Sequence, residues 1–150
     1  MSLNSIFDIA GSGMAAQSIR LNTTASNMAN ADTAASSTGE VYRAKKPVFA
    51  AVQFQTLNDM NATGMGGMGS AGEESQGVLV KDIVESDAPL DMRYEPHHPL
   101  ANEEGYVIYP NVNIVEEMTD MLSASRGFQT NVDVMDAAKT MMQRVLSLGQ

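Results

Sequence analysis

Residues 112–148 read VNIVEEMTDMLSASRGFQTNVDVMDAAKTMMQRVLSL, a stretch without a proline. Large apolar residues recur in it every seven positions, at Ile114, Met121, Phe128, Met135 and Met142. This spacing puts an apolar stripe on one side of an α-helix, and its repetition over about four heptads is typical of a coiled-coil seam. The stretch therefore predicts one helix, roughly 55 Å long at about 1.5 Å per residue, which needs an equally long partner.

A second helical pattern covers residues 3–29, where the same rhythm is carried by Leu3, Phe7, Met14, Leu21 and Met28. The residues between them are mostly glycine, alanine and serine, and such small side chains let another helix come close. Only Asp8 and Arg20 are charged before Asp32. We therefore expect this helix to be contacted on more than one side, because most of its circumference is neutral.

The middle of the chain has the alternation and the turn residues of short strands, which we expect at 48–54, 77–86, 92–95 and 105–110. Residues 56–77 are rich in glycine and methionine and are predicted to form a flexible loop. The predicted fold class is α+β, with long N- and C-terminal helices forming an antiparallel coiled coil around a small β-rich central insertion. The expected divisions are an N-terminal axial helix and polar loop at 1–39, the insertion at 40–110, and a C-terminal axial helix at 111–150.

Composition excludes several classes of function. The formal net charge is -9, which makes nucleic acid an improbable partner. The chain has no cysteine, so disulfides and thiolate zinc sites are excluded. No apolar run approaches the roughly 20 residues that span a bilayer, so we expect no direct membrane insertion. No basic residue precedes Arg20, and we therefore expect no cleaved secretory signal peptide.

No constellation of residues predicts catalysis. His97 and His98 are adjacent, so their side chains point apart on an extended loop, and a turn held by the flanking prolines explains them better than a metal site. Two carboxylate pairs, Glu103–Glu104 and Glu116–Glu117, are interpreted as solvated surface. We therefore predict no catalytic, metal-binding or cofactor-binding site, and a protein that is not an enzyme.

Polar residues interrupt both helical patterns. They gather at the end of the first helix and near the centre of the second: Asn22, Asn27, Asn30, Arg126, Gln129 and Asn131. Two interpretations stay open for them. They are exposed helix surface, or they control register, because a polar residue on a coiled-coil seam fixes alignment at some cost in stability.

Both ends of the chain resemble one family. GMAAQSIRLNTTASN at 13–27 and MANADTAASSTGEVYRAKKPVF at 28–49 resemble the N-terminal signature of bacterial flagellar rod and hook proteins. EMTDMLSASRGFQTNVDVMDAAKTMMQRVLSLGQ at 117–150 is similar to their C-terminal helix. The short insertion and YEPHHPLANEEGYVIYPNVNIVEEM, at 94–118, look like the proximal rod members rather than the longer distal rod and hook members.

The resemblance implies a structural subunit of the proximal rod of the flagellar basal body, which spans the periplasm. Such subunits leave the cytoplasm through the flagellar type III export apparatus without a cleaved signal. They assemble helically through their terminal helices, transmit torque and enclose the export channel. The implied partners are copies of the chain, other proximal and distal rod subunits and the rod-to-ring adaptor. The alternative is a cytosolic secretion adaptor or chaperone with a self-contained helical hairpin.

Shared heptad phase and this resemblance together predict which side chains meet neighbouring subunits. The expected apolar interface residues are Phe7, Met14, Leu21, Met28, Met118, Met121, Phe128, Val132, Met135, Met142 and Val145. The six polar residues named above are the expected register-setting part of the same interface.

Overall fold

The computed structural model describes residues 3–54 and 75–148. Its elements are helix α1 (Leu3–Ala29), strands β1 (Lys45–Phe54), β2 (Ser75–Glu85), β3 (Asp91–Tyr94) and β4 (Tyr106–Tyr109), and helix α2 (Ile114–Leu148). The predicted α+β architecture is confirmed, and each element lies within three residues of its expected bounds. The predicted loop at 56–77 lies outside the described residues, except that 75–77 already belong to β2.

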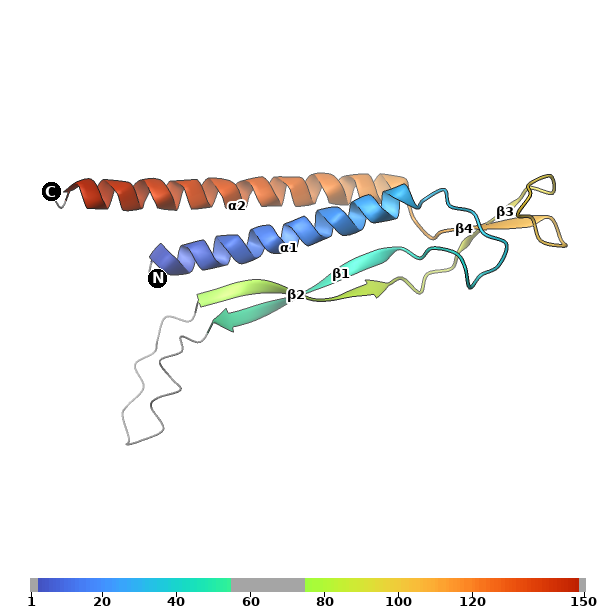
Figure 1. Ribbon diagram of the computed structural model, residues 1–150, viewed down its shortest axis with the longest axis horizontal. Coiled ribbons are helices and arrows are strands. Elements are labelled where there is room, and N and C mark those ends of the chain that lie inside the picture. Colours follow the sequence, from blue (N-terminus) through green and yellow to red (C-terminus); the bar gives the residue numbers. More distant parts are fainter. Residues whose placement is uncertain (1–2, 55–74, 149–150) are drawn as a thin grey trace, which may run out of the picture.

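Helices α1 and α2 lie side by side and run in opposite directions (Figure 1). Small side chains line the contact, and the buried ones include Ala10 and Ala16 on α1 and Ala124 and Ala138 on α2. Alanine allows two backbones to approach closely, but each methyl removes little apolar surface from water. The pair is therefore held by close contact over most of the length of α1 rather than by a thick apolar core.

Strands β1 and β2 form an antiparallel hairpin that packs along α1, on the side away from α2 (Figure 1). A bulge between Val48 and Phe49 bends the ribbon. The Val78 amide donates to Ser12 Oγ at 3.1 Å, which ties β2 to the first half of α1. Helix α1 is thus covered by α2 on one side and by strands on another, as its neutral circumference predicted.

Strands β3 and β4 form a second hairpin at the far end of the molecule (Figure 1). Its turn needs Gly105, whose φ of 82° is unfavourable for other residues and whose missing Cβ would lie 2.9 Å from the Tyr94 ring. His98 Nδ1 accepts the Leu100 amide at 3.1 Å, so this histidine holds a turn. Partial burial raises the pKa of Tyr109, and the negative charge and hydrogen bond of Glu95 raise it further.

Candidate assembly interface

Two side-chain amides pack against two glycines in the contact between α1 and α2. Asn131 of α2 packs against Gly13 of α1, so close that a Cβ on Gly13 would lie 2.7 Å from Asn131 Nδ2. Four residues along each helix the arrangement is reversed, because Gln17 of α1 packs against Gly127 of α2, where an added Cβ would lie 3.1 Å from Gln17 Nε2. Each glycine therefore makes room for an amide of the other helix, and this reciprocal contact defines the register of the pair.

An ion pair between the two helices supports the same register. Arg20 and Asp120 form an ion pair of 2.7 Å between the helices. Their side chains are 27% and 45% exposed, so solvent weakens the attraction and its contribution is about 1 kcal/mol at most. Inside the seam, Gln17 Oε1 is buried and has no hydrogen-bond partner among the described residues, which lowers the stability of the pair.

Two asparagines join the strands to the helices. Asn27 is 1% exposed; its Nδ2 donates to the Lys45 carbonyl at 2.8 Å, and its Oδ1 accepts the Lys45 amide and the Tyr42 hydroxyl, both at 2.9 Å. Asn111, just before α2, accepts the Ala44 amide at 2.9 Å and donates to the Ser86 and Ala88 carbonyls. Each asparagine thus uses both its donor and its acceptor, and together they fix where β1 begins and where β2 ends.

Most of the expected apolar interface residues are half-buried within the chain itself. The half-buried members are Phe7, Met14, Leu21, Met28, Met121, Val132 and Met135. Phe128 and Met142 are each 37% exposed at the edge of the seam. Met118 and Val145, by contrast, are 56% and 63% exposed. Met118 lies on another face of α2, and Val145 lies in the last turns of the helix, which extend beyond the start of α1 (Figure 1). Seven of the predicted residues are therefore partly covered within the chain, whereas Met118 and Val145 are left largely exposed.

Some of the expected polar residues are covered within the chain, and others are exposed. Asn27 lies in the interior of the protein, and Asn30 donates to the Ser26 carbonyl at the end of α1. Asn131 lies on the seam against Gly13. The other three, Asn22, Arg126 and Gln129, are exposed.

The interpretation of Glu116–Glu117 as solvated surface is wrong for Glu117, which is 6% exposed. Glu117 lies near the start of α2, which packs against α1, and it lines a cavity of about 360 Å³ together with Arg20, Thr24 and Lys45. Sequence reasoning also missed Gln17, Asn111 and Gly127, whereas Gly13 was among the small residues expected to let another helix come close. Gly127 was the available signal in the second helix, because a glycine inside a helical pattern often marks close packing.

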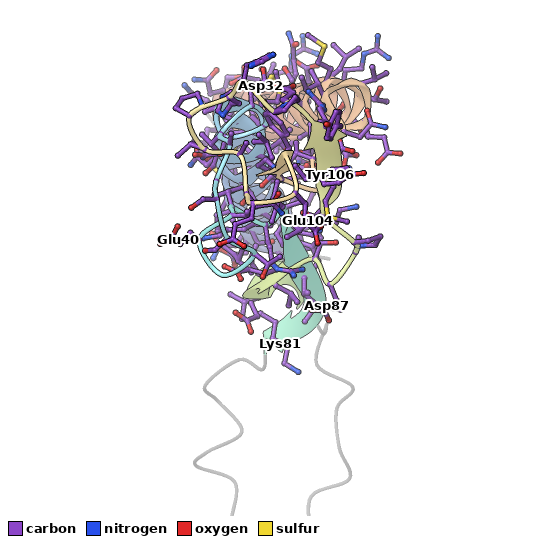
Figure 2. The ribbon with its side chains drawn as sticks, turned by 90° about the vertical axis from the view of Figure 1, so that its right-hand side faces the viewer. Asp32, Glu40, Lys81, Asp87, Glu104 and Tyr106 are labelled. Atoms are coloured by element: carbon purple, nitrogen blue, oxygen red, sulfur yellow. The ribbon has the colours of Figure 1, made fainter. Side chains whose placement is uncertain are left out.

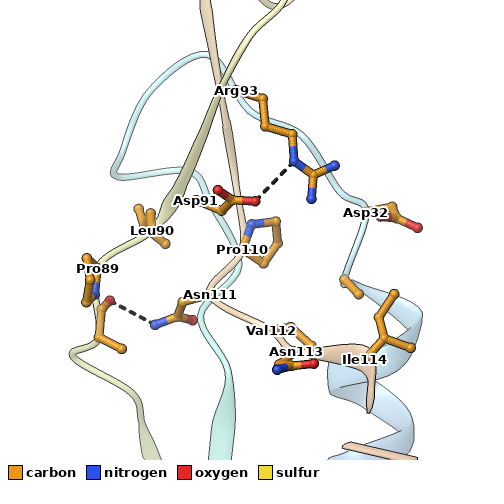
Figure 3. A pocket seen from close by; sticks show the side chains of 12 residues that line it. Asp32, Pro89, Leu90, Asp91, Arg93, Pro110, Asn111, Val112, Asn113 and Ile114 are labelled. Carbon is orange, nitrogen blue, oxygen red and sulfur yellow. Dashed lines mark hydrogen bonds and ion pairs between the residues drawn. The ribbon is translucent and has the colours of Figure 1, made fainter. Parts of the chain in front are cut away.

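A groove of about 640 Å³ opens where the end of α1, the start of β3 and the start of α2 meet (Figure 3). Asp91 and Arg93 form an ion pair of 3.0 Å at its upper wall, and Asn111 closes the opposite wall. Among the described residues, no group of three or more His, Asp or Glu side chains could hold a metal ion. In the same part of the chain, neither helix is apolar enough to cross a lipid bilayer.

Comparison with known proteins finds matches over both long helices. Residues 7–34 match the family model of flagella basal body rod proteins, and residues 103–148 match the C-terminal model of the FlgEFG flagellar basal body rod proteins. The chain is 47% identical to the flagellar basal-body rod protein FlgC of Escherichia coli O6:H1 over 150 residues, all of both chains. The chain belongs to the FlgC family of flagellar basal-body rod proteins.

Other members of the family match over the same length. FlgC of Salmonella typhimurium is 45% identical over all of both chains, and FlgC of Borreliella burgdorferi is 34% identical over all of this chain and 99% of its own. The resemblance stated from the sequence is therefore confirmed. The protein is a structural subunit of the flagellar basal-body rod, and it assembles with other components of that rod.

Proposed function

We propose that this subunit builds the proximal part of the rod by helical assembly and that neighbouring subunits pack on the outer face of α2. The observation that carries the proposal is a stripe formed by Val115, Met118 and Leu122, called the outer stripe below. These side chains are 71%, 56% and 55% exposed and follow one another at helical spacing. Monomeric proteins rarely leave such contiguous apolar surface uncovered, so the outer stripe supports a neighbouring chain as its cover.

The outer stripe and the seam lie on different sides of α2. The seam side, with Ala124 and Ala138 buried, is already occupied by α1. A second subunit would therefore add to the helical pair without opening it. Repetition of one such heterologous contact gives an open helical assembly, which suits a tube that encloses the export channel and transmits torque through many equivalent contacts.

Membership of the rod family supports a proposal for the individual partners. The subunit contacts copies of itself, other proximal and distal rod subunits and the rod-to-ring adaptor, and it reaches the periplasm through the flagellar type III export apparatus without a cleaved signal peptide. A catalytic role is not proposed, because His97 is exposed and His98 is engaged in a turn.

The alternative is a cytosolic secretion adaptor or chaperone. Packing of α1 on α2 within one chain is what such an adaptor would need. A self-contained hairpin, however, would have no use for the exposed outer stripe, and membership of the rod family favours the rod subunit.

The proposal is tested in flagellated cells whose own gene for this protein has been deleted. Without the gene we expect no motility and no complete rod in isolated basal bodies, and the wild-type chain should restore both. Leu122→Glu should reduce the fraction of swimming cells about tenfold or more, because it puts a carboxylate into an apolar contact. Ser123→Glu, at an exposed polar neighbour, is the matched control and should swim normally.

Two results would count against the proposal. Complete rods in the deletion strain would contradict the rod function itself. Normal motility of Leu122→Glu cells, with the variant present in their basal bodies, would contradict the use of the outer stripe.

A further inference from the structure

Glu117 is a buried acid without a partner among the described residues. Its side chain is 6% exposed, yet it forms no hydrogen bond or ion pair with any of them. Burial of a carboxylate is unfavourable unless a positive charge or hydrogen-bond donors replace the lost water. The neighbouring acid, Asp120, already has its counter-charge in Arg20 at 2.7 Å. A further positive charge beside Glu117 would therefore stabilise the fold.

The cavity of about 360 Å³ that Glu117 lines is called the Glu117 cavity below. Its walls come from three elements, because Arg20 belongs to α1, Glu117 to α2 and Lys46 to β1. In the described chain, the backbone of the β1–β2 hairpin packs close to α1 but not to α2. A side chain that crosses the Glu117 cavity would therefore join the hairpin to the second helix directly.

Two lysines of β1 border the Glu117 cavity, and they differ in what they contact. Lys45 is engaged elsewhere, because its ammonium lies 3.7 Å from Glu85 Oε1 and 5.7 Å from the centre of the Tyr42 ring. Lys46 is exposed, and its side chain forms no ion pair or hydrogen bond with any described residue. Neighbouring residues of a strand point to opposite faces, so Lys46 leaves β1 on the other side from Lys45. Lys46 thus supplies an uncommitted positive charge at this cavity.

We infer that the Lys46 ammonium turns into the Glu117 cavity and pairs with the Glu117 carboxylate. The stem of lysine is long and flexible, so it can carry its charge into a partly buried site. The ion pair latches β1 to α2 across the flank of α1. The β1–β2 hairpin is then held by both helices and moves with them as one body. This contact lies within one subunit and does not depend on any contact between subunits.

A double-mutant cycle tests the latch by thermal unfolding of the purified protein. Lys46→Met removes the charge but keeps a long side chain, so Glu117 stays buried without a counter-charge and the Tm should fall by about 5 °C. In a Glu117→Gln background the same change should lower the Tm by about 1 °C or less, because a neutral amide needs no counter-charge. Lys46→Arg keeps the charge and should retain the wild-type Tm within about 2 °C.

Lys81→Met is the matched control. Lys81 is an exposed lysine of the same hairpin, and Figure 2 shows it on the far side of the hairpin from the two helices. Its replacement should change the Tm equally in the wild-type and the Glu117→Gln backgrounds. A Lys46→Met effect that is also equal in the two backgrounds would overturn the latch.

A crystal structure of the wild-type protein gives a test for which no variant has to fold. We expect Lys46 Nζ within about 4 Å of a Glu117 carboxylate oxygen. A Lys46 ammonium that points into solvent would overturn the pairing. Either result leaves the rod function untouched, because the deletion strain tests that function separately.

Discussion

Asn27 shows how a single polar residue can specify the position of a strand. It lies in a helix whose other buried residues are mostly small, and it is among the largest fully buried side chains of the described chain. Its amide reproduces the pairing of a strand neighbour, because it gives one hydrogen bond to the Lys45 backbone and accepts another. The start of β1 is therefore fixed to α1 by geometry as well as by burial.

Replacing this side chain should lower stability measurably. Asn27→Ala leaves the Lys45 amide and carbonyl and the Tyr42 hydroxyl without their partner, so we expect the free energy of unfolding to fall by about 2 kcal/mol. Urea unfolding of the purified protein measures it. Asn22→Ala, an exposed asparagine of the same helix, is the control and should change the value by about 0.5 kcal/mol or less. Equal stability of the two variants would show that the Asn27 contacts are not formed.

At the scale of elements, the contact between α1 and α2 depends on two glycines that have no side chain. Gly13 and Gly127 leave space that Asn131 and Gln17 occupy. The register is therefore set by two interlocking steps and by the Arg20–Asp120 ion pair. A helix pair built only on large apolar residues would lack such steps and would slide more easily.

The two glycines of α1 make a matched test. Gly11→Ala should raise the free energy of unfolding by up to about 1 kcal/mol, because alanine favours a helix and nothing lies within 4 Å of the new methyl group. Gly13→Ala gains the same propensity but meets Asn131 Nδ2 at 2.7 Å, so it should be less stable than Gly11→Ala by about 1 kcal/mol or more. Thermal unfolding compares them. Adding Asn131→Ala should relieve the clash, and equal stabilisation by both glycine variants would exclude the interlock.

Sequence periodicity predicted the elements well, because the period of a helix or a strand is a local property. It could not tell which side of the α2 pattern faces α1. Met118 is larger and more apolar than Glu117, yet Met118 is 56% exposed and Glu117 is 6% exposed. Close approach of the backbones selects small or well-covered side chains for the inner side and leaves the bulky ones outside. The roles of Gln17 and Asn111 depend on residues far away in the chain, which a single sequence does not reveal.

At the scale of the whole molecule, two long helices carry more apolar surface than one chain can cover. The outer stripe and the last turns of α2 both leave large apolar side chains exposed. The outer face of α2 thus offers a contact to a neighbouring chain that leaves the helical pair intact. Repetition of one such heterologous contact that does not close is enough to generate a helical assembly.

Phe128 tests whether the helical pair has to stay intact for assembly. It is 37% exposed at the edge of the seam, so a carboxylate there disturbs both the contact with α1 and any neighbour beside it. Phe128→Asp should abolish swimming on soft agar while the protein is still made, as checked by immunoblotting. Phe128→Leu keeps an apolar side chain and should swim. Normal swimming of Phe128→Asp cells would contradict the role of the pair in the rod.

Electron cryomicroscopy of the rod in isolated basal bodies tests the central claim most directly. The measurement is the environment of Val115, Met118 and Leu122 in the assembled subunit. The account predicts that this stripe is buried against a neighbouring subunit, while α1 and α2 stay paired within each chain. A rod in which the outer stripe of this protein faces solvent, or one from which the protein is missing, would contradict it.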